Sequence, residues 1–168
     1  MKPFDQVDRL ERARALDGPA HALDVLSGLM PDGRWRSALT GRPIGHAAHP
    51  MLVQIPIGAW VSAGWLDCLP RTERSAAVLT GIGIATALPA VAAGLVDYSA
   101  LGERQRRTAV VHASANALAV VCQVLSLRDR TSGRLRRGQW IGLAGTLALA
   151  VGGLLGGHLA HPRPPTSG

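Results

Sequence analysis

Four long stretches without a single charged residue constrain this chain more than any other feature of its sequence. They cover residues 43–66, 75–96, 108–127 and 138–162, which is 24, 22, 20 and 25 residues. A helix that crosses the roughly 30 Å hydrocarbon core of a bilayer needs about 20 apolar residues. The sequence therefore predicts an all-α protein, a four-span transmembrane helical bundle. The expected spans are about 49–67, 75–97, 109–127 and 139–160.

A soluble four-helix bundle is the competing interpretation. It would show an apolar stripe opposite a charged face on each helix. No such face exists here, because all charges lie outside the four stretches, although 17% of the 168 residues are charged. The remaining 77 residues are too few to cover four helices that are apolar all round. We therefore expect the lipid bilayer to be the partner of these helices.

The chain is predicted to have three parts: a tail at 1–42, a membrane domain at 43–162 and a short C-terminal tail at 163–168. Apolar residues at helical spacing predict two short amphipathic helices in the N-terminal tail, broken at Gly18 and Pro19. No cleavable signal peptide is recognisable, which slightly favours a cytoplasmic tail on a multi-pass protein of the cell membrane. Arginines near the spans are shared equally between the two sides, so orientation stays open. We detect no internal repeat.

The net charge of +7 does not indicate a nucleic-acid partner. The basic residues are dispersed over the tail and loops, and an aromatic content of 4% leaves few groups for base stacking. Arginines beside membrane helices commonly determine topology instead.

Signs of stand-alone enzymatic activity are missing. The sequence has no Gly-rich phosphate loop, no nucleophile elbow and no close carboxylate pair. Cys68 and Cys122 are isolated and are expected to be small buried hydrophobic residues.

Glycines four residues apart in the last span favour close helix approach, although a chain with 20 glycines can produce this spacing by chance. The pairs are Gly138 with Gly142, Gly152 with Gly156, and Gly153 with Gly157.

Polar residues gather at one level of the predicted bundle. Four antiparallel spans bring the starts of spans one and three to the same side as the ends of spans two and four. The residues found there are His46, His49, Asp97, His112, Asn116, His158 and His161. Ionisable groups inside membrane spans are costly and indicate a functional site by default.

Several chemistries suit these histidines. They can be structural, bonding to carbonyls or headgroups in a non-catalytic membrane scaffold or partner-binding protein. Alternatively, His49, His112 and His158 can supply axial ligands to haem b, with Ala115, Ala119 and Gly157 leaving room for the macrocycle. The same three histidines, with Asp97, can instead bind non-haem iron or zinc. A proton or quinone site remains a further alternative.

The segments Gly41–Trp60 and Leu66–Asp67 resemble a family of membrane proteins known as domain of unknown function 2231. Gly94–Tyr98, Val111–His112 with Asn116, and Gly156–Leu159 resemble later motifs of that family, in the same order. The segments Leu10–Ala13 and Ala15–Asp17 are similar to variants in which this domain precedes a Rieske iron-sulfur domain.

This resemblance implies a four-span membrane domain and suggests membrane electron transfer. It agrees with the haem interpretation of His49, His112 and His158. No iron-sulfur ligands follow His158 in this chain. A redox partner such as an iron-sulfur protein is therefore expected to be a separate chain, and an oligomer of the chain itself is left open.

Overall fold

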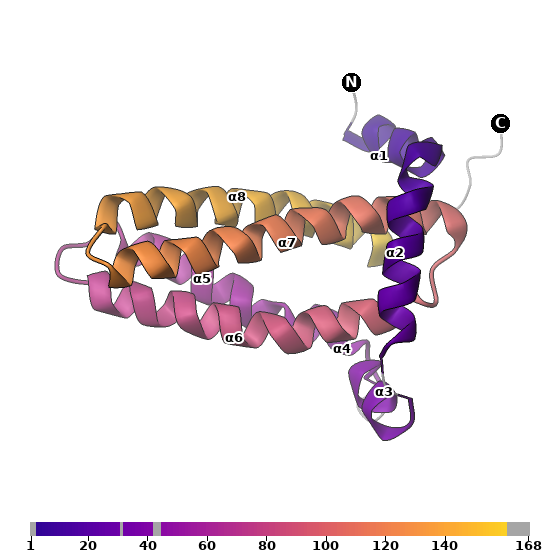
Figure 1. The fold of residues 1–168 in the computed structure, drawn as a ribbon, viewed down its shortest axis with the longest axis horizontal. Helices are drawn as coiled ribbons and strands as arrows, with labels where there is room; N and C mark the ends of the chain where they lie inside the picture. The colour runs from indigo at the N-terminus through magenta and orange to yellow at the C-terminus, as the bar shows by residue number, and fades with distance from the viewer. Residues whose placement is uncertain (1–2, 31, 42–44, 161–168) are drawn as a thin grey trace.

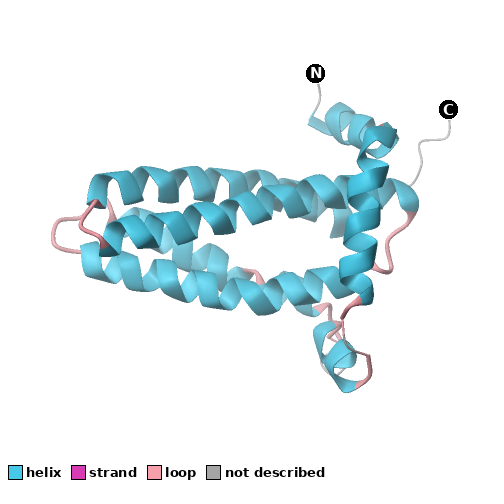
Figure 2. Ribbon diagram, in the orientation of Figure 1, coloured by secondary structure: helices cyan, strands magenta, loops and turns pink. Residues whose placement is uncertain are grey.

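The computed structural model describes residues 3–30, 32–41 and 45–160, and within these ranges the secondary structure is helical without strands (Figure 2). The predicted C-terminal tail at 163–168 and His161 lie outside the described residues. The elements are α1 (Pro3–Arg12), η1 (Arg14–Leu16), α2 (Asp17–Gly28), α3 (Arg34–Leu39), α4 (Ala48–Leu52), α5 (Gln54–Leu66), α6 (Glu73–Tyr98), α7 (Glu103–Thr131) and α8 (Leu135–Ala160).

Three helices are long and apolar enough to cross a membrane, and they lie side by side in an elongated bundle (Figure 1). They are α6, α7 and α8, with candidate spans of 26, 29 and 25 residues. These helices match three of the four predicted spans and confirm the all-helical fold class for the described residues. Because α5 has only 13 residues, helix length alone does not establish the fourth span.

A proline accounts for the interruption of the first predicted span. Pro56 has no N–H to bond the Leu52 carbonyl four residues earlier, and α4 ends at Leu52. The chain nevertheless stays helical, since Val53 N bonds to His49 O at 3.1 Å and Ile57 N bonds to Val53 O at 3.1 Å. Thus α4 and α5 form one kinked helical rod.

Glycines let α8 lie directly against α7. A Cβ at Gly138 would lie 2.9 Å from Ser126 O, and one at Gly145 would lie 2.8 Å from Cys122 Cβ. Gly142, Gly152 and Gly156 also face α7 side chains. The close approach predicted from glycine spacing is confirmed for these positions but not for Gly153 and Gly157, which have open space around them.

The N-terminal tail folds across one end of the bundle, where α2 crosses α6 and α7 (Figure 1). Tyr98 donates its hydroxyl to Ala20 O at 2.9 Å, and Arg106 pairs with Asp24 at 2.9 Å. The predicted break at Gly18 and Pro19 is wrong. The break falls at Ala13 instead. Gly18 and Pro19 lie in the first turn of α2, where backbone N–H groups have no partner within the helix, so the missing N–H of proline costs no hydrogen bond.

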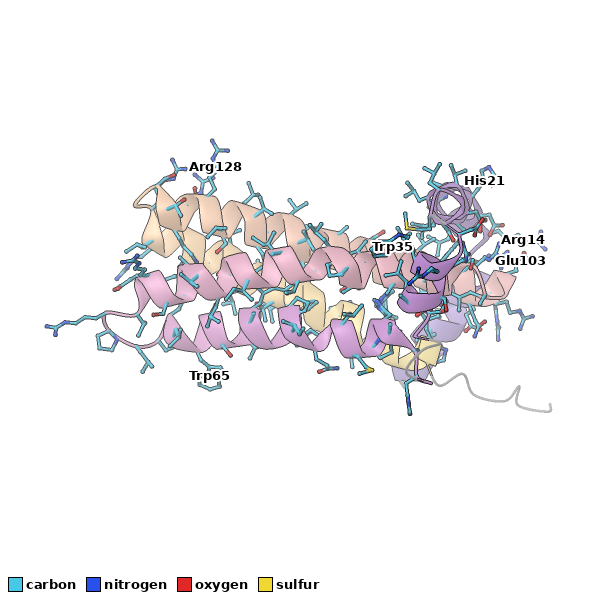
Figure 3. All side chains as sticks on the ribbon, turned by 90° about the horizontal axis from the view of Figure 1, so that it is seen from below. Arg14, His21, Trp35, Trp65, Glu103 and Arg128 are labelled. Atoms are coloured by element: carbon cyan, nitrogen blue, oxygen red, sulfur yellow. The ribbon has the colours of Figure 1, made fainter. Side chains whose placement is uncertain are left out.

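Exposed aromatic rings mark both ends of the bundle. Trp65 and Arg128 lie toward one end, and Trp35 lies at the other with the tail (Figure 3). Trp65 and Trp140 are 73% and 71% exposed, which fits the interfacial position predicted for them. Trp60 is instead buried and donates to Thr80 O.

The two cysteines differ in exposure. Cys122 is half-buried, whereas Cys68 is exposed beyond the end of α5. Burial of Cys68 was therefore a wrong prediction, because the residue lies in the turn that follows the helix.

Candidate functional site

Two of the predicted histidines meet inside the bundle. His49 comes from α4 and His112 from α7, and their ring centroids are 6.2 Å apart at an interplanar angle of 79°. Both side chains are half-buried. The pair joins helices that are far apart in the sequence, so helix packing creates it.

Each imidazole is fixed by a backbone carbonyl of the helix beside it. His49 Nδ1 lies 2.8 Å from Ala90 O, and His112 Nδ1 lies 2.7 Å from Gly152 O. A carbonyl oxygen only accepts hydrogen bonds, so Nδ1 carries the proton in both rings. Nε2 is therefore the atom that keeps a lone pair, and this tautomer is the one found in histidines that ligate metals.

Small residues make room for both rings. A Cβ at Gly94 would lie 3.0 Å from His49 Cε1, and a Cβ at Gly156 would lie 2.8 Å from His112 Cε1. Each imidazole thus fills a notch in the helix that also supplies its carbonyl acceptor.

Two further predicted residues lie near the pair. Asn116 Nδ2 is 3.1 Å from His112 Nε2 and 3.4 Å from Nδ1 of the same ring. A donor that approached Nε2 along its lone pair, in the plane of the ring, would be much farther from Nδ1 than from Nε2. The amide of Asn116 is almost equally far from both nitrogens, so it lies over the face of the ring and leaves the Nε2 lone pair accessible. Asp97 interacts electrostatically with His49.

His158 makes a different contact. Its Nε2 lies 3.3 Å from Glu11 Oε1, which links α8 to α1 of the tail. His46 is exposed in the turn before α4. The structure therefore brings together His49 and His112, with Asn116 and Asp97 beside them, while His158 faces the tail.

The described residues contain no group of three His, Cys, Asp or Glu side chains that could hold one metal ion. The three-histidine metal site predicted from the sequence is not assembled in this part of the chain. What the described site offers is two imidazoles.

The opposite end of the bundle holds a buried ion pair that sequence reasoning missed. Arg130 donates to both carboxylate oxygens of Asp67, at 2.7 and 2.5 Å, and their side chains are only 3% and 14% exposed. Arg130 also donates to Ser126 Oγ at 3.1 Å. In the sequence, Arg130 is one of several arginines in an apparent loop, and nothing distinguishes it from Arg128 or Arg134.

A cavity of about 590 Å³ lies beside this ion pair, between α5 and α8. Its lining includes Trp65, Asp67, Arg130, Trp140 and Leu143. No described histidine lines this cavity, so it is separate from the pair of His49 and His112.

Long apolar helices around a half-buried histidine pair and a buried ion pair are typical of a helical membrane protein. The chain belongs to the family described as Predicted membrane protein (DUF2231), whose sequence profile matches residues 45–162. The resemblance drawn from the sequence motifs is therefore confirmed. No curated protein and no solved structure matches the chain significantly.

Proposed function

We propose that this protein is a four-span subunit of the cell membrane that carries electrons through a haem b iron bound by His49 and His112. In this proposal α4 and α5 are the first crossing. Residues 48–66 are 19 residues of nearly continuous helix, or about 28 Å, close to the thickness of the hydrocarbon core. The N-terminal tail then lies on the same side as the His49 end of the bundle.

The observation that carries the haem assignment is the paired, carbonyl-anchored imidazoles. Two imidazoles that bind one metal ion through nitrogens about 2 Å away hold their ring centroids roughly 5 to 6.5 Å apart. The observed 6.2 Å lies in this range. Hydrogen bonds from Nδ1 to carbonyls also make Nε2 a better ligand.

The number of donors favours haem over a bare metal ion. A non-haem zinc site usually takes three or four protein ligands, whereas the described site offers two imidazoles. A haem would bring its own four nitrogen ligands to the iron, so His49 and His112 would be sufficient to hold it. The helix pairs α5–α6 and α7–α8 pack more closely within each pair than between pairs, and His49 and His112 lie on opposite sides of the seam, so we place the haem between the pairs.

Each element of the site has a defined task in this proposal. When bound, the haem supplies one-electron chemistry by alternating between ferric and ferrous iron. The carbonyls of Ala90 and Gly152 hold the two rings in orientation. Asn116 and Asp97 provide the polar surroundings. The electron partner is a separate redox protein, such as an iron-sulfur protein.

A non-catalytic scaffold is the second candidate, and the contact between His158 and Glu11 favours it. This histidine ties the tail to the bundle and needs no cofactor. If His49 and His112 likewise serve only to hold helices together, their bonds to carbonyls are sufficient reason for their presence.

Haem content of purified variants distinguishes the two candidates. We expect His49→Ala and His112→Ala to lose most of the bound haem, while His158→Ala, which removes only a tail contact, retains it. His112→Met should keep haem with an altered spectrum, because methionine is also an axial ligand. Equal haem content in all four variants would refute haem binding by His49 and His112. If wild-type protein made with haem available contains no haem, the scaffold is favoured instead.

A further inference from the structure

We infer that the membrane domain consists of two copies of one helical hairpin, related by a pseudo-two-fold axis that runs along the bundle. The first hairpin is residues 48–98 and the second is residues 111–160. Positions in the first helix of each hairpin correspond with an offset of 63 residues, and positions in the second helix correspond with an offset of 62. This duplication does not depend on whether the site binds haem.

The histidine contacts are the first matching set. His49 bonds to Ala90 O at 2.8 Å, and His112 bonds to Gly152 O at 2.7 Å. The two histidines differ by 63 positions and the two acceptors by 62. The notch glycines, Gly94 and Gly156, also differ by 62 and contact the same Cε1 atom of their histidines.

A second set of matching contacts lies deeper in the bundle. Trp60 Nε1 donates to Thr80 O at 3.2 Å, and Gln123 Nε2 donates to Gly142 O at 3.1 Å. Trp60 and Gln123 are both 2% exposed and differ by 63 positions, and their acceptors differ by 62. The side chains have diverged completely, yet each one joins the two helices of its hairpin in the same way.

The burial pattern repeats along both helices. Of the 19 positions from 49 to 67, 14 have the same degree of burial as their counterparts at 112–130. Of the 25 positions from 73 to 97, 19 match their counterparts at 135–159. Two unrelated hairpins would not keep a common register over both helices.

The arrangement of the helices agrees with a two-fold axis parallel to them. Both hairpins run in the same direction along the bundle (Figure 1). Exchanging the hairpins turns the contact between α6 and α7 into the contact between α8 and α5, and both contacts are present. Parallel repeats with an axis along the membrane normal are a known plan for membrane bundles.

Equivalent residues of the two hairpins meet at two levels. At one end, His49 meets its own counterpart His112. At the other end, Asp67 meets Arg130, which is again 63 positions later. A hairpin paired with a second copy of itself would bring two Asp67 carboxylates, or two Arg130 guanidinium groups, to this buried level.

The opposite charges of Asp67 and Arg130 therefore determine which hairpin each hairpin pairs with. Two like charges without a partner at a buried level are strongly unfavourable, whereas the existing pair satisfies both groups. Asp67 and Arg130 thus make the first hairpin pair with the second hairpin of the same chain. This assigns the ion pair a role in choosing the partner of each hairpin.

An exchange of charges in the full-length chain tests this inference. Asp67→Arg and Arg130→Asp should each lower the thermal unfolding midpoint in detergent by about 10 °C or more, because each leaves two like charges buried. The double variant D67R/R130D should recover most of this loss, since a two-fold axis makes the two positions interchangeable. The milder variants D67N and R130Q measure the same coupling if a reversal prevents folding, and their double variant should lose less than the sum.

The matched control is the pair of Asp129 and Arg134, joined at 2.7 Å but not related by the axis. Asp129 is 7% exposed at its side chain and Arg134 is 50% exposed, so their surroundings differ. Asp129 has a second partner, Arg137, at 3.1 Å, so the control is made in an R137Q background, where we expect D129R/R134D to remain as unstable as its single variants. Failure of D67R/R130D to recover, or equal recovery in the control, would overturn the inference. Haem content does not enter this measurement, so its result is independent of the proposed function.

Discussion

At the scale of single residues, the histidine site depends on a glycine that faces each imidazole ring: Gly94 faces His49 and Gly156 faces His112. His49 and His112 could be nominated from the sequence because a histidine in a membrane span is costly and because antiparallel helices place both at one level. Their acceptors could not be predicted, since the carbonyls of Ala90 and Gly152 have no sequence signature. His158 looked equivalent in the sequence, but its side chain points to Glu11 of the tail.

Gly156 offers a direct test at this scale. In Gly156→Ala the new methyl group would lie about 2.8 Å from His112 Cε1, so the ring must move away from its carbonyl. We expect a loss of stability of about 1–3 kcal/mol, typical of overpacking, together with reduced haem content. Thermal unfolding and the haem spectrum measure the two effects.

The control for this variant lies next to it in the chain. A methyl group on Gly157 would meet no described residue of another element within 4 Å, so Gly157→Ala should leave both properties near wild type. Identical behaviour of the two variants would mean that the notch at Gly156 does not hold the histidine.

At the scale of helices, the uncharged runs were sufficient to predict α6, α7 and α8. The first predicted span is broken because Pro56 removes one helical hydrogen bond and the structure divides the rod there. The internal repeat could not be found in the sequence, because Trp60 and Gln123 share a role without sharing chemistry. The correspondence of positions between the two hairpins is visible only in their matching contacts and burial.

A buried arginine makes several of the contacts that hold the tail. Arg107 donates to Asp17 at 2.6 Å, to Glu11 O at 2.9 Å and to Glu103 at 2.8 Å, and its side chain is 9% exposed. We expect Arg107→Gln to release α1 and α2 from the bundle. Limited trypsin digestion should then cut the tail roughly tenfold faster than in wild type, because cleavage follows the population of the open form.

Arg104 supplies the comparison for the tail experiment, because it is exposed in the same turn of α7. Arg104→Gln should leave the digestion rate close to wild type. A tail that stays protected in Arg107→Gln would show that the contacts of Tyr98 and Arg106 suffice to hold it.

At the scale of the whole molecule, the four-span bundle requires α4 and α5 to cross the membrane together as the first span. Only then do the two hairpins each cross the membrane twice, with His49 and His112 at the same membrane level. The family assignment and the apolar character of α6, α7 and α8 place the chain in a membrane. The sides on which the two ends of α4 and α5 lie test the first crossing.

Labelling of single cysteines in intact membrane vesicles measures it most directly. Native Cys68, studied in a C122A background, reports the far end of α5, and Ala47→Cys in a C68A/C122A background reports the exposed start of α4. Reference cysteines at Arg104 and Ser132 mark the two ends of α7. We predict that position 47 labels from the same side as position 104, and that Cys68 labels from the opposite side together with position 132. Labelling of positions 47 and 68 from one side would contradict the four-span bundle and the duplicated hairpin with it.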